Sequence, residues 1–247
     1  MPEGPSIVIL RERAEGFAGK RVLDAGGNTR TIDPIRMKSR TVRRVASWGK
    51  HFLIQFDGFV LRVHFMLFGS YTIDEDMPGR APRLQLRFAG GRRLNLYACS
   101  VRYLEGAIDE LYDFGTDVMS DSWNPRAALR ALRAQPETLA CDALLDQDVF
   151  SGVGNIIKNE VLFRIRVHPE SRIGALPPAK LRELVKQARE YSFDFYHWKK
   201  AYVLRKHYQV HTRTQCPRDG TRLSYAKALG RKQRRAFWCP ECQRLYR

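Results

Sequence analysis

Residues 146–163 read DQDVFSGVGNIIKNEVLF, which predicts a glycine-containing turn that runs directly into a helix. Gly152 and Gly154 leave the turn without side chains, and Asn155 is the expected cap of the helix. The helix should bury one apolar stripe, formed by Ile156, Ile157, Val161, Leu162 and Ile165. Such a turn presents backbone N–H groups to an anion, so it is either a phosphate-binding site or simply a capped helical hairpin.

The chain changes character near Gly115. Before this point, apolar residues at helical spacing predict a helix from Pro5 to about Gly19, and seven short strand-like segments follow with turn signals between them. Many short strands predict a β-sandwich or barrel. After it, the sequence predicts a linker, a helix capped by Ser122 or Asn124, and further helices. A β-rich half therefore precedes a helical half, with a small cysteine-bearing unit at the end.

The charge of the chain predicts a polyanionic partner. Its 247 residues carry 43 Lys or Arg against 26 Asp or Glu, a net charge of +17. Residues 196–247 hold fourteen of these cations and two acids, so most of the positive field belongs to the C-terminal fifth.

Composition also predicts the cellular setting. No run approaches the roughly 20 apolar residues that cross a bilayer, and an early Glu3 with no apolar core behind it argues against a signal peptide. Five cysteines, three of them clustered near the end, do not form the pattern of a secreted disulfide framework. A cytoplasmic protein in a reducing environment is expected.

The start of the chain, MPEGP, offers a reactive amine once Met1 is removed. A terminal amine has a pKa of about 7.7–8.0, well below the value of about 10.4 for lysine, so Pro2 would be neutral far more often at neutral pH. Only a neutral amine attacks carbon, and the iminium formed by proline would draw electrons during elimination. Glu3 could move protons at the same centre. The alternative is an ordinary terminus without chemistry.

Two more motifs in the first half allow either chemistry or ordinary structure. Lys50 follows Trp-Gly and precedes an apolar strand, so it could bind phosphate or donate a proton, or be a solvated hairpin lysine. The second motif is HFMLFG, whose apolar side chains are either core or, where the strand opens into a loop, a wedge that holds a duplex open. Strand alternation would divide its residues into two sets, Phe65 and Leu67 on one face and His64, Met66 and Phe68 on the other.

Spacing typical of metal ligands occurs near the end of the chain. CPRD and CPEC flank a predicted short β-hairpin, and their candidate ligands are Cys216, Asp219, Cys239 and Cys242. Three thiolates and a carboxylate can hold zinc in a tetrahedron. His211 is another candidate ligand, and a metal-free hairpin is the alternative.

Between the two cysteine motifs lies GRKQRRAF, a basic segment that is expected to form a turn. Most charge runs are solvated faces, but one held between metal ligands would be rigid enough to contact a nucleic-acid backbone. Arg234 and Arg235 could therefore neutralise phosphates.

Taken together, these motifs resemble one family, the DNA glycosylases that include formamidopyrimidine-DNA glycosylase and endonuclease VIII. PEGP, WGKHF, HFMLFG, GTDVMSD, GVGNIIKNEVLF and RRAFWCPEC follow one another in that family's order across essentially the whole chain. The resemblance implies domains that clamp DNA. It divides the chain into an N-terminal helix plus β-sandwich domain at 1–115, a linker at 116–124, a helical domain with a helix-two-turns-helix motif at 125–210 and a zinc-finger-like β-hairpin at 211–247.

The resemblance also implies roles for residues at matching positions. Pro2 would attack C1′ of the deoxyribose and form a Schiff base, and Glu3 would donate a proton as the glycosidic bond breaks. Lys50 would assist β-elimination, and Arg234 would grip a flanking phosphate and assist δ-elimination. The residues that would contact DNA are His64, Met66, Leu67, Phe68, Asn155 and Arg235. The zinc ligands would be Cys216, Asp219, Cys239 and Cys242, with Asp219 standing where the family has a cysteine.

The function that the resemblance implies is a monomeric bifunctional DNA glycosylase and AP lyase of base excision repair, acting on damaged duplex or single-stranded DNA. PEGP and the short segment between the last long helix and the finger resemble the endonuclease VIII branch, which favours oxidised pyrimidines. The alternative is a non-catalytic basic protein that binds DNA through the helical turn and the finger.

Overall fold

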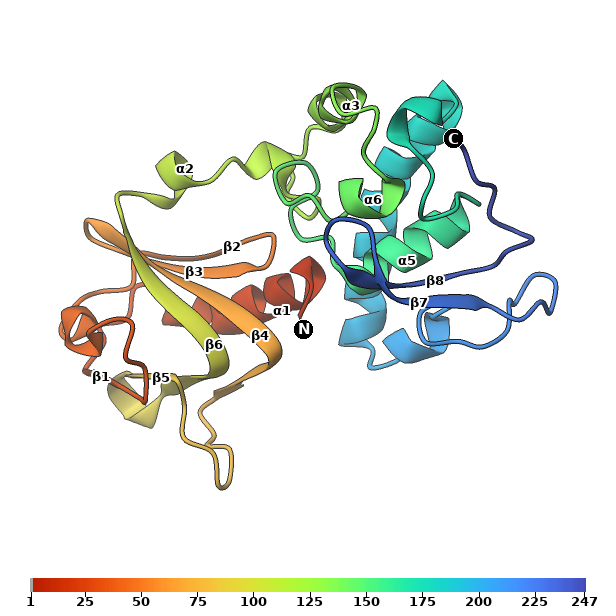
Figure 1. Cartoon of the computed structure of the whole chain (residues 1–247). Coiled ribbons are helices and arrows are strands. Elements are labelled where there is room, and N and C mark those ends of the chain that lie inside the picture. Colours follow the sequence, from red (N-terminus) through yellow and green to blue (C-terminus); the bar gives the residue numbers. More distant parts are fainter. Residues whose placement is uncertain (1) are drawn as a thin grey trace. The chain divides into compact units, whose positions relative to one another are not determined.

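The computed structural model describes residues 2–247, which divide into two compact units, one ending at Asp113 and the other covering Phe114–Arg247 (Figure 1). The boundary expected near Gly115 lies close to this division. The finer limits of the linker, the helical domain and the finger stay predictions.

The first unit is a β-sheet with one long helix. Its main elements are α1 (Gly4–Ala14), β1 (Asp24–Gly26), β2 (Arg44–Trp48), β3 (His51–Phe56), β4 (Phe59–Ile73), β5 (Leu84–Arg87) and β6 (Arg93–Glu105). Short helical turns connect them, namely η1 (Glu15–Phe17), η2 (Pro34–Met37), η3 (Ala89–Gly91) and α2 (Ile108–Leu111).

The helix α1 begins where the sequence predicts it, because Pro5 fits the first helical turn. It ends earlier than expected, at Ala14, and continues as the tighter turn η1 to Phe17. The helix packs against β2 and β3.

The two layers expected of a sandwich are formed by one continuous antiparallel sheet with the strand order β1-β5-β6-β4-β3-β2. The first part of β4 pairs with β3 and with the second part of β6, whereas Ser70–Ile73 pair with the first part of β6, beside β5. The two predicted segments FVLRVHFML and GSYTI are thus one long strand, β4, with an irregularity between Phe65 and Ser70. Long strands that serve both layers replace the many short strands of the prediction.

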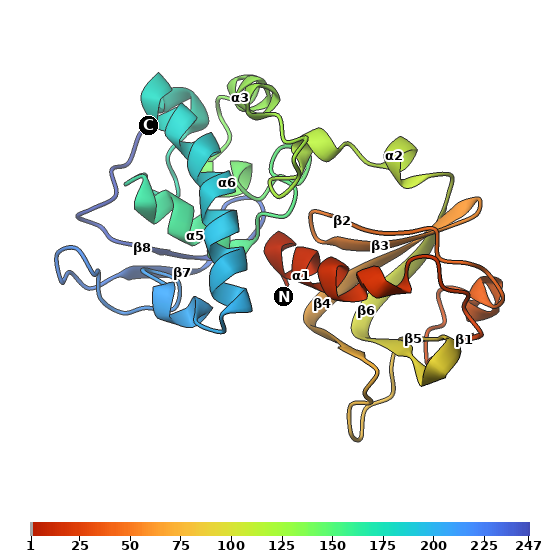
Figure 2. The same cartoon turned by 180° about the vertical axis from the view of Figure 1, so that it is seen from behind.

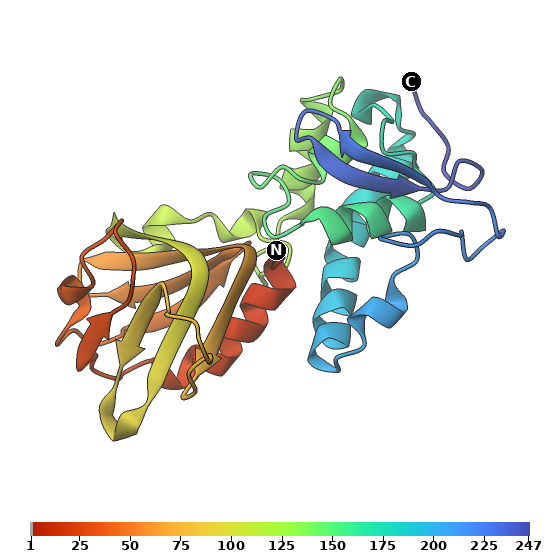
Figure 3. The same cartoon turned by 60° about the horizontal axis from the view of Figure 1, so that its bottom comes forward.

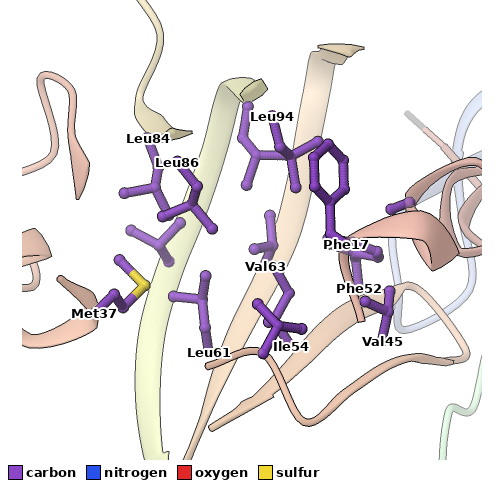
Figure 4. Close-up of a cluster of buried hydrophobic side chains, with 14 of the residues drawn as sticks. Phe17, Met37, Val45, Phe52, Ile54, Leu61, Val63, Leu84, Leu86 and Leu94 are labelled. Carbon is purple, nitrogen blue, oxygen red and sulfur yellow. The ribbon is translucent and has the colours of Figure 1, made fainter. Parts of the chain in front are cut away.

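The core of the first unit lies between these layers and α1. Figure 4 shows apolar side chains of the strands pointing toward one another, joined by Phe17 at the end of the helical segment and by Met37. Alternation along β3 and β4 places one face of each strand in this core.

The second unit is helical and ends in a small hairpin. Its elements are η4 (Phe114–Thr116), α3 (Pro125–Arg133), α4 (Ala140–Ala143), α5 (Asn155–Arg164), η5 (Ile173–Ala175), α6 (Pro178–Lys200), η6 (Leu204–His207), β7 (Ser224–Leu229) and β8 (Arg234–Trp238). Of the two expected caps, Asn124 is the one used, because its side chain accepts a hydrogen bond from the Ala127 N–H at 3.0 Å.

The long helix α6 forms one side of the helical core (Figure 2). The strand β8 packs against α5, so the terminal hairpin is attached to the helical part of the unit (Figure 3). Among residues 2–247, none of the helices has the length and apolar character that a membrane span requires.

Candidate active site and DNA-binding residues

The start of the first unit places a half-buried Pro2 directly before a buried Glu3. Glu3 is 3% exposed and has an extended backbone, and its carbonyl accepts a hydrogen bond from the Ser6 N–H at 2.8 Å. Its carboxyl group makes no capping hydrogen bond to α1. The chain therefore presents a carboxyl group shielded from water next to the proline.

Lys50 occupies a tight turn at the same side of this unit. Trp48 and His51 are register partners, so the β2–β3 turn consists of Gly49 and Lys50 alone. Gly49 has a φ of 51°, which a two-residue hairpin turn requires and glycine adopts at little cost. The start of α1 lies beside this turn (Figures 1 and 2). The sequence-predicted residues Pro2, Glu3 and Lys50 therefore come from adjoining segments.

His64 belongs to a ring cluster that sequence reasoning missed. It is the register partner of His51 across β3 and β4, and the two ring centroids lie 5.5 Å apart. The ring of His51 also lies 5.5 Å from that of Trp48 and 5.9 Å from that of Tyr112. The signal available in the sequence was the position of His51, first in its strand directly after Lys50.

Burial keeps this histidine pair uncharged at neutral pH. Burial, with smaller contributions from the nearby charges of Arg62, His64 and Lys50, lowers the pKa of His51 to about 4. Burial first, and then Lys50 and Arg62, also lower the pKa of His64. The Nδ1 atom of His51 is buried without a hydrogen-bond partner among residues 2–247. A neutral imidazole can donate or accept one hydrogen bond at each nitrogen without adding charge beside Lys50.

The motif HFMLFG does not follow strand alternation. Phe65 is buried in the core, but Met66, Leu67 and Phe68 are exposed by 52%, 61% and 76%. Three consecutive large apolar side chains in water form the exposed arrangement that a wedge requires, and the core alternative is wrong for Leu67.

Gly69 closes this irregularity by allowing a close approach. A Cβ atom at Gly69 would lie 2.6 Å from Cβ of Phe65 and 3.0 Å from the carbonyl oxygen of Ala98. Ala98 itself has a φ of 44°, so the distortion of β4 is matched by one in β6.

In the second unit, Asn155 does not cap α5 as predicted. Gly154 is the cap residue and Asn155 the first helical residue, with its side-chain Oδ1 buried and without a hydrogen-bond partner among the described residues. The two flanking glycines explain the difference, because Gly152 has a φ of 99° and Gly154 takes the extended conformation that precedes a helix.

The predicted apolar stripe of α5 is also too narrow, since this helix is buried nearly all round. Lys158 donates a hydrogen bond to the Arg235 carbonyl at 2.8 Å. Asn159 accepts one from the Phe237 N–H at 3.2 Å and lies 3.1 Å from Nδ1 of His211. These buried polar residues attach β8 to the helix.

Glu160 continues this polar attachment. Its carboxylate accepts hydrogen bonds from the backbone N–H groups of Gln209, Val210 and His211, at 2.9, 3.1 and 2.7 Å. Burial raises the pKa of Glu160, whereas these three hydrogen bonds lower it. The segment before the finger is thereby tied to the same helix.

Asp142, on α4, holds the turn of the terminal hairpin. Its two carboxylate oxygens accept hydrogen bonds from the N–H groups of Arg231 at 2.7 Å and Lys232 at 3.0 Å. Gly230 has a φ of 67°, and a Cβ atom there would collide with the same carboxylate. No side chain fits at this position, which explains the glycine.

The basic residues beside this turn are exposed as expected, although they lie on β8 rather than in the turn. Arg234 is the first residue of β8 and pairs with Leu229, and Arg235 follows it. Both side chains are exposed. They are therefore carried on a strand whose backbone is fixed by Asp142 and Lys158.

The structure gathers the four predicted metal ligands. One ligand atom from each of Cys216, Asp219, Cys239 and Cys242 lies within 4.8 Å of the others. The sulfur atoms of Cys216 and Cys242 are 3.6 Å apart, close to the separation of about 3.8 Å expected for two thiolates on one tetrahedral zinc. Asp219 Oδ2 lies 2.8 Å from the Cys242 sulfur. The donor set therefore fits a metal ion that prefers thiolates.

His211 is not part of this cluster. Its Nδ1 atom faces Asn159, and its ring lies 5.3 Å from that of Phe237. The side-chain Oδ1 of Asn159 accepts a hydrogen bond from the Phe237 N–H, so the side-chain NH₂ group of Asn159 faces His211. The Nδ1 atom of His211 then accepts a hydrogen bond from this NH₂ group. The suggestion that His211 binds the metal is wrong.

Comparisons with known proteins agree with these features. The model of the formamidopyrimidine-DNA glycosylase N-terminal domain matches residues 1–99, and that of the formamidopyrimidine-DNA glycosylase H2TH domain matches residues 114–191. Endonuclease 8-like 2 of Mus musculus is 27% identical over 98% of this chain and 96% of its own length. Endonuclease 8-like 3 of Xenopus laevis is 34% identical over 81% of this chain, a match that covers 34% of that protein.

Solved structures share the fold. A viral DNA glycosylase superposes with a TM-score of 0.86 at 19% identity, over 98% of this chain and 100% of the other. Lactococcus lactis formamidopyrimidine-DNA glycosylase, non-covalently bound to DNA with an AP site, has a TM-score of 0.84 at 20% identity, over 98% and 99% of the two chains. Both domain matches and the relatives agree on one assignment: the chain belongs to the formamidopyrimidine-DNA glycosylase and endonuclease VIII family of DNA-repair glycosylases.

Proposed function

We propose that this protein is a bifunctional DNA glycosylase and AP lyase that removes oxidised bases, with pyrimidines favoured. The observation that carries the proposal is the pairing of Pro2 with a buried Glu3, beside the turn that holds Lys50. By resemblance to the family, PEGP and WGKHF would be its catalytic motifs.

The chemistry starts at the nitrogen of Pro2. After removal of Met1, which lies outside the described residues, the neutral amine attacks C1′ of the damaged nucleotide and the base departs with its bonding electrons. Glu3 supplies a proton as the glycosidic bond breaks, and its carboxyl group is shielded from water beside Pro2. The N–C1′ bond has then replaced the glycosidic bond. The nitrogen loses its proton, and its lone pair forms the iminium as the C1′–O4′ bond breaks and O4′ takes up a proton. The iminium draws the electrons released when a proton leaves C2′.

Elimination follows in two steps. Loss of the 3′ phosphate is β-elimination, in which Lys50 assists, and loss of the 5′ phosphate is δ-elimination, in which Arg234 assists by holding a phosphate. His64, Asn155 and Arg235 contact the DNA backbone.

The lesion must leave the duplex before this chemistry. Flipping a nucleotide out of the duplex costs a few kcal/mol, and the cost is lowest at damaged bases. Met66, Leu67 and Phe68 fill the space that the flipped nucleotide leaves. Their exposure, in a row and in water, supports this role.

A metal ion completes the finger in this proposal. Zinc would be held by Cys216, Asp219, Cys239 and Cys242, and when bound it supplies rigidity rather than chemistry. The four residues would fix the ends of the hairpin from which Arg234 and Arg235 project.

Borohydride trapping tests the covalent step. The processed protein should form a stable adduct with DNA containing an abasic site, and Pro2→Gly should form it at least about tenfold more slowly. Pro5→Ala is the matched control, because it changes the same helix start but leaves the terminal nitrogen intact. A non-catalytic DNA-binding protein would give no adduct, and intact mass spectrometry would report whether Met1 has been removed.

A panel of duplexes with single defined lesions tests the substrate. Oxidised pyrimidines should be excised faster than oxidised purines at equal enzyme concentration. Equal or reversed rates would contradict the preference without touching the Schiff-base chemistry.

A further inference from the structure

The end of α6 carries an aromatic residue where glycine is usual. The Val203 N–H donates to the Trp198 carbonyl at 2.9 Å and the Tyr202 N–H to the Lys199 carbonyl at 3.1 Å, the two hydrogen bonds of a Schellman motif. Tyr202 takes the left-handed position of this motif, with a φ of 59°. A bulky residue is unfavourable there because its Cβ crowds the backbone.

The ring of Tyr202 lies largely in solvent. The side chain of Tyr202 leaves the residue 85% exposed, the highest exposure among the large hydrophobic residues of the described chain. Backbone strain and an exposed ring at one position are a reason to look for function.

The surroundings of Tyr202 are positively charged. Lys199, Lys200, Arg205 and Lys206 are all exposed, and the sequence has no acid between Asp194 and Asp219. We name the surface formed by Lys199, Lys200, Tyr202, Arg205 and Lys206 the α6 terminal patch.

The patch is held in one conformation. The rings of Trp198 and His207 stack at 4.1 Å with an angle of 2°, which fixes η6 to the end of α6. From the other side, the guanidinium of Arg213 donates to the carbonyls of Arg205 at 2.8 Å and Tyr208 at 3.0 Å. A rigid surface loses little entropy on binding.

We propose that the α6 terminal patch binds single-stranded DNA, with its cations on the phosphates and an unpaired base stacked on Tyr202. Sites for single strands combine cations that follow the backbone with aromatic faces for bases. Bases inside a duplex already stack on each other, so an exposed ring has most to gain from an unpaired one. The inference rests on the proposed function in so far as DNA is the substrate, and it adds a contact remote from Pro2 in the sequence.

Substitution of Tyr202 by glycine separates this role from a structural one. Tyr202→Gly relieves the left-handed strain, so its melting temperature should be unchanged or higher. Its affinity for a single-stranded oligonucleotide, measured by fluorescence anisotropy, should fall about fivefold or more. An unchanged affinity, or a lower melting temperature with a proportional loss of binding, would overturn the proposal.

Removing two cations of the patch tests its phosphate contacts. Lys199 and Lys200 also lie where cations stabilise the carbonyl end of a helix, so the test uses the double variant Arg205→Gln/Lys206→Gln. The slope of log affinity against log salt for single strands should become shallower by about 1.4, since each phosphate contact contributes about 0.7. Arg126→Gln/Arg130→Gln, which removes the same charge from exposed positions on α3, should leave the slope unchanged. If both double variants changed the salt slope equally, the patch would attract DNA only through the general positive charge of the chain, which would overturn the proposal.

The outcomes are distinguishable from failure of the proposed function. Wild-type protein that yields no borohydride adduct with abasic DNA refutes the catalytic proposal. An adduct formed by wild type, together with unaltered single-strand binding by Tyr202→Gly, refutes only the patch. If Tyr202→Gly lowered the affinity for duplex and single-stranded oligonucleotides equally, the stacking of an unpaired base on Tyr202 would also be refuted.

Discussion

At the scale of single residues, burial decides the charge around Lys50. His51 and His64 face each other across two strands, and both pKa values lie below the ordinary histidine value. At neutral pH the pair is uncharged, so it adds no positive charge beside Lys50.

The pH dependence of stability follows from His51. Above pH 6.5 the residue is neutral in both states, but below it the unfolded state takes up the proton first, because folding lowers the pKa to about 4. The free energy of unfolding should fall between pH 6.5 and 4, by up to about 1.4 kcal/mol per pH unit from this residue. Urea unfolding at several pH values measures this dependence. The free energy of unfolding should change less with pH for His51→Gln than for wild type.

The exposed His197 supplies the control for this measurement. His197→Gln should keep the wild-type slope. Imidazole NMR showing that His51 titrates between pH 6 and 7 would contradict the argument directly.

Asp219 is the second residue whose chemistry can be tested alone. A thiolate binds zinc more tightly than a carboxylate in such sites, so Asp219→Cys should raise zinc affinity and Asp219→Ala should lower it, by about tenfold or more. Competition with a chromophoric chelator measures both. Glu241→Cys adds a thiol near the cluster without replacing a ligand, and an equal gain there would show that position 219 is not a ligand.

At the scale of elements, the hairpin β7–β8 depends on contacts from outside itself. Its turn is bound by Asp142 of α4, and β8 is bound by Lys158 and Asn159 of α5. A two-stranded hairpin alone is marginally stable in water, so these contacts set its position.

Asp142→Ala should loosen this turn. It leaves two backbone N–H groups without their acceptor, each loss costing about 1–3 kcal/mol if the groups stay buried, so the melting temperature should drop. If Arg234 assists δ-elimination, the ratio of δ- to β-elimination product should fall while adduct formation at Pro2 continues. Product analysis on sequencing gels measures the ratio.

Asp146→Ala is the matched control on the same segment. Its carboxylate accepts a hydrogen bond from the Asp148 N–H at 3.1 Å and none that is observed from the hairpin turn. A product ratio that changes equally in both variants would argue against positioning through Asp142.

At the scale of the whole molecule, the net charge of +17 governs association with DNA. Binding releases counterions from the DNA, so log affinity for a duplex should fall linearly with log salt, at about −0.9 per phosphate neutralised. Four contacts would lower the affinity roughly 100-fold between 50 and 200 mM salt. Anisotropy titrations measure this slope, and an affinity independent of salt would contradict the proposed use of the basic surfaces.

Several features were predictable from the sequence because they depend on neighbours in the chain. The strand-like segment HFLIQF, followed by the turn signal Asp57-Gly58, marked β3, and Asn124 before Pro125 marked the start of α3. The spacing of Cys216, Asp219, Cys239 and Cys242 predicted their cluster, and motif order predicted the family. The roles of Pro2, Glu3 and Lys50 stay predictions, since geometry alone does not test chemistry.

Other features were decided only by the tertiary structure. The partner of His51 is thirteen residues away in sequence and meets it through strand pairing, and Asp142 meets Arg231 through packing of α4 on the hairpin turn. Lys158, Asn159 and Glu160 resemble the solvated face of a helix until β8 binds the first two and the backbone of residues 209–211 binds the third. Local patterns in the sequence determine which helices and strands form. Burial, pKa values and long-range hydrogen bonds depend instead on which of these elements pack against one another.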